Sequence, residues 1–168
     1  IERLDAGGWS ALLEGTDLVV WSAGAGGGDP ARTKAVDEVA AIASMDACPR
    51  EAGYVMVSYW GARPDHGVPE DNAFVHYADA KAAADEHLRG SGLRYVILKP
   101  GALTEEPAGN VFVGDDAAEV PEGVERTTAR TTVAAMIAHV VGRFDELAGE
   151  RGREIAFLDG DAPLGEAV

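Results

Sequence analysis

Three short apolar runs, each followed by a loop that contains glycine, limit the folds open to this chain. The runs cover residues 17–21, 54–58 and 95–98. Continuous apolar runs of this length are typical of strands buried on both faces of a parallel sheet. Segments with apolar residues at helical spacing separate them, so the order strand, helix, strand, helix, strand predicts an α/β fold with helices on both faces of a parallel sheet.

Local signals place the helices between these strands. Asp29 and Pro30 suit the cap and the first position of one helix. A second helix carries Tyr77 and runs to about Arg89, just before two glycines. The rest of the chain is predicted to hold an irregular acidic stretch, a further helix and a last strand, at residues 105–125, 133–141 and 154–158.

Length and composition predict one domain over residues 1–168. A chain of 168 residues with 46% hydrophobic residues can bury one core but is short for two. No apolar run approaches the roughly 18 residues of a membrane span, and no signal-peptide pattern opens the chain. We therefore expect a soluble, cytoplasmic protein. Cys48 is the single cysteine, and the four histidines lack metal-ligand spacing, so no metal site is predicted.

The charge balance is strongly acidic, with 29 acidic against 14 basic residues and a net charge of -15. Nucleic acids and anionic membranes both need a basic surface, so neither is an expected partner. An acidic surface with few lysines fits a high-salt cytoplasm, and a GC-rich coding bias explains the few lysines equally well.

Tyr77 and Lys81 lie four residues apart on one predicted helix, and therefore on one face of it. An ammonium beside a phenol favours the ionised phenol, which is the chemistry of a proton donor for carbonyl reduction. The alternative is a surface tyrosine and lysine on an amphipathic helix. The residues around the pair are needed to choose between these two interpretations.

Other candidate residues follow the predicted strands, where ligands bind in open parallel sheets. These residues are Ala23, Gly24, Ser58, Pro100 and Gly101. Because the carboxyl ends of parallel strands share one edge of the sheet, we expect Tyr77 and Lys81 to face the same crevice as these loops.

The glycine-rich loop after the first strand does not match a dinucleotide phosphate cradle. In the pattern G-x-G-x-x-G counted from Gly24, Asp29 takes the place of the last glycine, and its carboxylate would repel a pyrophosphate. Ala23 and Gly24 instead let the backbone pass close to a ligand, or form a flexible turn.

Several segments in order along the chain resemble one family. They are W-S-A-G-A-G-G at 21–27, A-V-D at 35–37, V-S at 57–58 with G-A at 61–62, Y-A-D-A-K at 77–81, A-D-E-H-L at 84–88, S-G-L-R-Y at 91–95, K-P-G-A-L-T at 99–104 and F-L-D-G-D-A-P-L at 157–164. Together they resemble the atypical short-chain dehydrogenase/reductase family of NAD(P)-binding proteins, over nearly the whole chain.

The resemblance implies a Rossmann-like, doubly wound domain that binds NADP or NAD, with NADP favoured. It implies that Tyr77 donates the proton, and that Lys81 holds the nicotinamide ribose and lowers the Tyr77 pKa. It further implies that Ser58 orients the substrate carbonyl. Asp37 matches an aspartate that this subgroup has where other short-chain enzymes place an asparagine.

The same resemblance implies that the cofactor is bordered by residues on two loops. These are Ala23 and Gly24 after the first strand, and Pro100, Gly101 and Ala102 as a wall against the nicotinamide. From the residues alone, Asp37 reads as a solvated helix residue and Pro100-Gly101 as a strand terminator.

The sequence departs from the family in three places. The family's fingerprint G-x-x-G-x-x-G is absent, and the chain begins at Ile1. We therefore expect the C-terminal portion of a longer chain that lacks its first strands, about 60 residues by the usual unit size; a natural remnant that binds no dinucleotide normally is the alternative. The junction before Tyr54 is short, and the interval of 19 positions from Ser58 to Tyr77 is wide.

Two functions follow from these observations. The first is an NAD(P)-dependent oxidoreductase or epimerase that acts on a small carbonyl or alcohol. The second is a non-catalytic NAD(P)-binding protein that senses redox state or regulates a partner. A helper subunit that completes another chain's sheet is a third possibility. We expect a small-molecule substrate and a monomer or homodimer, while the acidic stretch holds no cluster that names the substrate.

Overall fold

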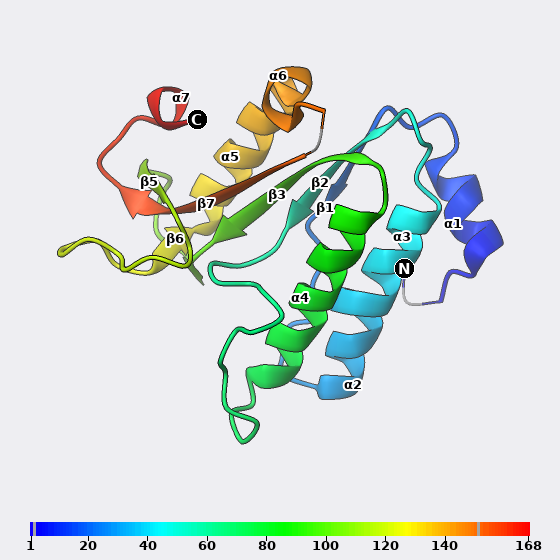
Figure 1. Ribbon diagram of the computed structural model, residues 1–168, viewed down its shortest axis with the longest axis horizontal. Coiled ribbons are helices and arrows are strands. Elements are labelled where there is room, and N and C mark those ends of the chain that lie inside the picture. The colour runs from blue at the N-terminus through cyan, green and yellow to red at the C-terminus, as the bar shows by residue number, and fades with distance from the viewer. Residues whose placement is uncertain (2, 151) are drawn as a thin grey trace.

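The central sheet of the protein has the strand order β1-β2-β3-β7-β5 (Figure 1). A computed structural model describes residues 1, 3–150 and 152–168. The strands are β1 (Leu18–Trp21), β2 (Gly53–Val57), β3 (Arg94–Pro100), β7 (Arg153–Gly160) and β5 (Asn110–Gly114). Strands β1, β2, β3 and β7 are parallel to one another, and β5 runs antiparallel to β7. The predicted parallel sheet is confirmed, with an antiparallel strand at one edge.

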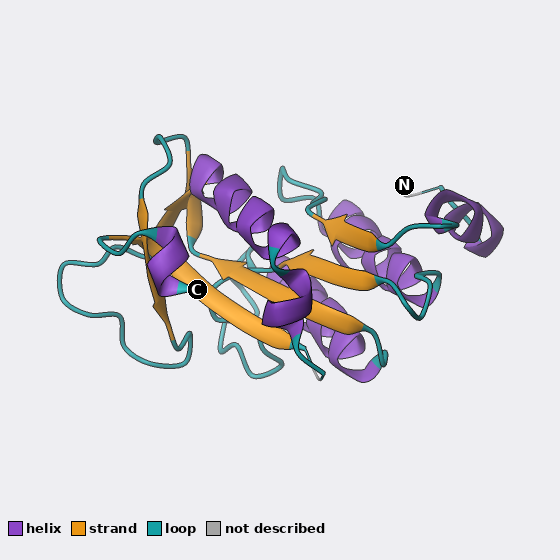
Figure 2. Cartoon of the chain, turned by 90° about the horizontal axis from the view of Figure 1, so that it is seen from above, coloured by secondary structure: helices purple, strands orange, loops and turns teal. Residues whose placement is uncertain are grey.

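Helices cover both faces of this sheet, as Figures 1 and 2 show. One face carries α2 (Pro30–Thr33), η1 (Lys34–Ala40), α3 (Ala41–Asp46) and α4 (Val75–Gly90), with α1 (Ala6–Leu13) beside α3. The other face carries α5 (Arg130–Gly142) and α6 (Phe144–Ala148), and the short α7 (Leu164–Ala167) lies against β5. The Rossmann-like, doubly wound arrangement predicted for the chain is confirmed.

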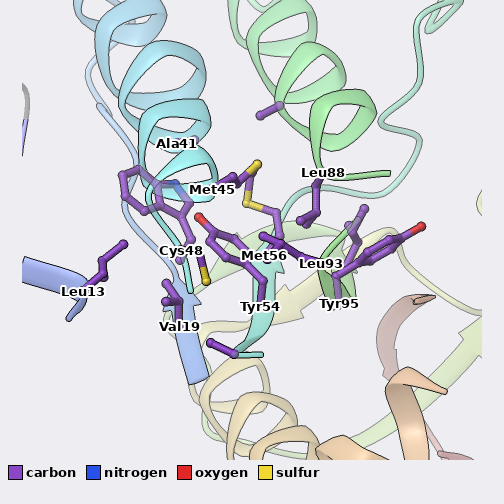
Figure 3. Close-up of a cluster of buried hydrophobic side chains, with 14 of the residues drawn as sticks. Leu13, Val19, Ala41, Met45, Cys48, Tyr54, Met56, Leu88, Leu93 and Tyr95 are labelled. Carbon is purple, nitrogen blue, oxygen red and sulfur yellow. The ribbon is translucent and has the colours of Figure 1, made fainter. Parts of the chain in front are cut away.

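Alternating side chains of the buried strands supply two separate cores. Tyr54 and Met56 of β2 point into the cluster under α3 and α4, whereas Val55 joins the cluster under α5 and α6. Figure 3 shows the first cluster, in which Met45 and Leu88 meet the two β2 side chains. The Tyr54 hydroxyl is satisfied there by the Ser44 hydroxyl at 2.6 Å. Strands with apolar residues on both faces therefore carry helices on both faces.

The helix predicted after Asp29 forms, but its middle is wound more loosely. Both Ala31 and Arg32 donate backbone N–H groups to Asp29 Oδ1, at 2.9 and 3.1 Å, which confirms the predicted cap. The following η1 segment is a π-helix, a conformation often found at functional sites. It carries Asp37, which is 1% exposed. The reading of Asp37 as a solvated helix residue is therefore wrong.

The acidic stretch is more regular than the sequence suggested. It contains β5, where Val111 is fully buried and Asn110 pairs with Gly160 of β7. Apolar side chains at Val111, Phe112 and Val113 are what allow this segment to add to the sheet edge. A small parallel pair of strands, β4 (Ala102–Thr104) and β6 (Thr127–Ala129), brackets the stretch.

Two further kinds of feature are lacking in the described residues. None of the described helices combines the length and the apolar character that a membrane crossing requires. Nor do three or more His, Cys, Asp or Glu side chains of the described residues gather as a metal ion would need.

Candidate active site

Two cavities meet at the carboxyl ends of β1, β2 and β3, and the Tyr77 ring borders both. The first cavity, of about 400 Å³, is lined by Tyr59, Trp60, Phe74, Tyr77, Pro100, Gly101, Ala102, Leu103 and Arg126. The second cavity, of about 380 Å³, is lined by Gly26, Gly27, Gly28, Thr33, Ala73, Phe74, His76 and Tyr77. Loops from all three strands thus reach Tyr77, as parallel strands with a shared edge predict.

Helix α4 places Tyr77, Lys81 and Asp85 on one face, because each lies four residues after the one before. Tyr77 is half-buried at the cavities, whereas Lys81 is 1% exposed and Asp85 is fully buried. The Lys81 ammonium donates a hydrogen bond to the Val57 carbonyl at 2.6 Å. The helix therefore runs from an accessible phenol to a buried charge pair.

Asp37 links the loop after β1 to this helix. Its Oδ2 accepts a hydrogen bond from the Ala25 N–H at 3.0 Å. A Cβ placed on Gly24 would lie 3.3 Å from Asp37 Oδ1, so the loop passes close over the carboxylate. Asp37 also interacts electrostatically with Lys81 and Tyr77. The predicted pair and the predicted aspartate are thus brought together.

Ser58 occupies a different place from the one its expected role requires. Its hydroxyl donates to Asp85 Oδ2 at 2.6 Å, and the residue is only 3% exposed. Ser58 lines neither of the two cavities at Tyr77. In this structure the serine supports the buried Asp85 carboxylate rather than the space available to a substrate.

The pKa values of the pair follow from burial. Burial lowers the pKa of the Lys81 ammonium, and the Asp85 and Asp37 carboxylates oppose that change. Burial also raises the pKa of the Tyr77 phenol, and Asp37, Tyr59 and Asp85 raise it further. The net direction of the Tyr77 pKa is therefore upward, because desolvation is the largest cause and nearby carboxylates add to it. The phenol is protonated at neutral pH, and a lowering by Lys81 stays a prediction.

Three aromatic rings form the wall beside this phenol. The Tyr77 ring lies 5.2 Å from Phe74 and 5.6 Å from Tyr59 between centroids, and Tyr59 meets Phe74 edge-on at 5.3 Å. Such contacts fix ring orientation at a half-open surface. Burial raises the pKa of Tyr59 to about 12, with Asp85 contributing next. The cavity therefore offers a flat apolar wall with two protonated phenols.

The turn after β3 forms the opposite wall. Pro100, Gly101 and Ala102 line the first cavity with Tyr77. A Cβ on Gly101 would lie 2.7 Å from both the Arg126 carbonyl oxygen and Leu158 Cδ2, so packing alone already requires glycine here. The structure brings this predicted wall to Tyr77.

Ala23 and Gly24, the two residues predicted to border the cofactor from the first loop, lie away from the cavities. Ala23 is partly buried against the core under α3 and α4, and Gly24 is exposed. Neither lines the cavities at Tyr77, whereas Gly26, Gly27 and Gly28 of the same loop do. All three of these glycines have positive φ, the conformation that glycine adopts without strain.

Sequence reasoning missed Asp85, Tyr59 and Phe74 as parts of the site. Asp85 follows Lys81 by four residues, and that spacing alone could have pointed to it. Its carboxylate is fully buried, and Oδ1 has no hydrogen-bond partner among the described residues. A buried carboxylate with a perturbed pKa next to a cleft is a candidate functional group.

Asp85 should give the unfolding free energy a specific pH dependence. Burial raises the pKa of Asp85 from 3.8 to about 6, against the Ser58 hydrogen bond and Lys81, which lower it. The folded state therefore holds this proton more tightly than the unfolded state does. The resulting stabilisation is complete below the unfolded pKa and is lost as the pH rises through about 6.

Between about pH 5 and about pH 7.5 the wild type should lose about 1.4 kcal/mol of unfolding free energy relative to Asp85→Asn. Urea unfolding of both proteins at the two pH values measures this difference. Asp71→Asn, which removes one exposed charge before α4, is expected to follow the wild type. Equal changes in all three proteins would contradict the burial of an Asp85 carboxylate.

Comparisons with known proteins identify the family to which the chain belongs. Residues 1–143 match the sequence model of a family described as NAD(P)H-binding. A Bacillus subtilis protein named as an uncharacterized sugar epimerase, YhfK, is 31% identical over 169 residues, which cover 95% of this chain and 71% of that protein. The UPF0659 protein YMR090W of Saccharomyces cerevisiae is 31% identical over 140 residues, covering 82% of this chain and 61% of that protein.

A solved structure from Bacillus halodurans, named as an NAD-dependent epimerase/dehydratase, superposes on the whole of this chain and on 74% of that one. The TM-score is 0.80 and the sequence identity is 28%. The fold and the family match agree with the resemblance inferred from the sequence. This chain therefore belongs to the NAD(P)H-binding family.

Proposed function

We propose that the protein is an NAD(P)-dependent oxidoreductase or epimerase in which Tyr77 exchanges a proton with a small carbonyl or alcohol. The observation that carries this proposal is the placement of one half-buried phenol on two cavities, on the same helix face as the buried Lys81 four residues later. A catalytic acid needs this combination of access and a fixed protonation state.

The residues around Tyr77 fit a nicotinamide cofactor. Pro100, Gly101 and Ala102 give a flat apolar wall, and the loop after β1 presents glycines whose backbone a ligand can approach closely. The cofactor, when bound, supplies or takes up a hydride. NADP is our preferred cofactor, with NAD as the alternative that the experiment below tests.

Each residue of the buried network has a distinct part in this proposal. Tyr77 donates its proton to the carbonyl oxygen during reduction and takes it back during oxidation. Lys81 is 1% exposed, lines neither cavity and donates to the Val57 carbonyl, so its part is to keep a positive charge near the phenol from inside the protein. The Asp85 and Asp37 carboxylates interact electrostatically with this ammonium, while Ser58 donates to Asp85 and Asp37 accepts from the first loop.

One observation favours a second function, that of a non-catalytic NAD(P)-binding sensor. The Ser58 hydroxyl, which would orient a substrate carbonyl, is bound to Asp85 and lines neither cavity. If the protein is an enzyme, the substrate carbonyl must be oriented by another donor or by Ser58 after its side chain rotates on substrate binding. A sensor would need neither.

Titration of the protein with NADPH and NADH by fluorescence, followed by mixing with a panel of small aldehydes, ketones and alcohols, tests the proposal. We expect saturable binding, tighter for NADPH, and consumption of reduced cofactor with at least one carbonyl. Tight binding without turnover of any panel member would instead support the sensor. Absence of binding for both cofactors would overturn both functions.

A further inference from the structure

Arg126 is the exception among the residues around the first cavity. The other eight lining residues are aromatic, aliphatic, proline or glycine, and none carries a carboxylate. Arg126 is exposed and is the one charged residue in this lining. A cavity with this composition offers a single positive group beside a large apolar surface.

The backbone around Arg126 is held firmly against the wall of that cavity. The Arg126 carbonyl oxygen accepts a hydrogen bond from the Ala102 N–H at 2.9 Å. The same carbonyl oxygen leaves no room for a Cβ on Gly101. Arg126 also directly precedes β6, which pairs with β4. The side chain therefore starts from a fixed point at the Pro100–Ala102 turn.

Arg126 makes no ion pair with any carboxylate of the described residues. This is unexpected on a chain with twice as many acidic as basic residues. Nearby, Arg130 pairs with Glu105 at 2.7 Å, and Lys99 pairs with Asp116 at 3.0 Å. Two acids of the loop around β5, Glu105 and Asp116, are thus paired with other cations, and no ion pair of the described residues occupies the Arg126 guanidinium, which leaves it available to an anion.

We propose that Arg126 is the specificity residue of the site and selects carbonyl substrates that carry a carboxylate on a flat apolar body. A guanidinium recognises a carboxylate through two parallel hydrogen bonds, and the aromatic wall of Tyr59, Phe74 and Tyr77 favours a flat body. A single arginine suits one carboxylate better than a phosphate, which usually gathers more donors. The inference rests on the proposed function, because Tyr77 lines the same cavity and would serve the carbonyl.

Calorimetric binding tests this inference without any turnover. The probes are 4-carboxybenzaldehyde and its neutral methyl ester, each titrated into protein saturated with oxidised cofactor, so that no hydride is available. The carboxylate is expected to bind the wild type about 10 to 100 times more tightly than the ester does, because a desolvated ion pair contributes about 1.5–3 kcal/mol. Arg126→Ala should remove this preference while changing ester binding less than about threefold.

Arg130→Ala is the matched control. Arg130 lies four residues after Arg126 and carries the same charge, but it does not line the cavity. This variant should keep the carboxylate preference, and Arg126→Lys should keep only part of it. A wild type with no preference for the carboxylate, or a preference that survives in Arg126→Ala, would overturn the inference. Selective binding in a protein that reduces no carbonyl would instead refute the proposed function and leave the role of Arg126 standing.

Discussion

Replacing Tyr77 with Phe is expected to lower carbonyl turnover by about 10² to 10⁴-fold, because the group that donates the proton is removed. The affinity for NADPH should stay within about threefold, since the ring and its contacts with Tyr59 and Phe74 remain. Single-turnover oxidation of bound NADPH measures the loss, and the fluorescence titration measures the affinity.

Tyr59→Phe is the matched control for this experiment. Tyr59 lines the same cavity and lies 5.6 Å from Tyr77, yet it has no lysine four residues along a helix. Removal of the Tyr59 hydroxyl should change turnover less than about fivefold, because only a positioned acid acts in the transition state. Equal losses in the two variants, or an unchanged rate in Tyr77→Phe, would refute Tyr77 as the proton donor and favour the sensor.

Lys81→Met is expected to destabilise the protein and to abolish measurable turnover. The ammonium is 1% exposed and compensates the buried carboxylates of Asp37 and Asp85. Methionine fills a similar volume but removes the buried positive charge that interacts with those carboxylates. Leaving a buried charge without its compensating partner costs up to about 3–5 kcal/mol, so the midpoint of urea unfolding should fall clearly.

Lys34→Met controls for the loss of a lysine. Lys34 is exposed and pairs with Glu38 on the surface of η1, so its replacement should change the unfolding free energy by less than about 0.5 kcal/mol. The double variant Lys81→Met/Asp85→Asn should be less destabilised than the two single effects add up to, because the unpaired charge is gone. Equal unfolding free energies for Lys81→Met and Lys34→Met would show that Lys81 carries no buried charge.

The sequence was sufficient for the fold because its signals were local and agreed with one another. The apolar runs gave β1, β2 and β3 together with their parallel order, and the Asp29 cap fixed the start of α2. The edge strand β5 escaped prediction, since Asn110–Gly114 is short and lies in an acidic stretch. Its pairing depends on β7, which lies about 45 residues further along the chain.

The site was predicted only where a spacing or a strand end pointed to it. Tyr77, Lys81 and Pro100 met these conditions and lie together. Asp85 has the same spacing of four residues from Lys81, but an aspartate in a helix is normally a solvated charge, and only the packing of α4 on the sheet buries it. The orientation of Ser58 also depends on that buried carboxylate. Partners in a three-dimensional network leave no mark in the local pattern.

A crystal structure of the protein with NADPH tests the central claim most directly. We predict the nicotinamide ring in the first cavity, between the Tyr77 phenol and the wall formed by Pro100, Gly101 and Ala102. A nicotinamide bound away from Tyr77, or a Tyr77 hydroxyl turned into bulk solvent in the complex, would contradict it.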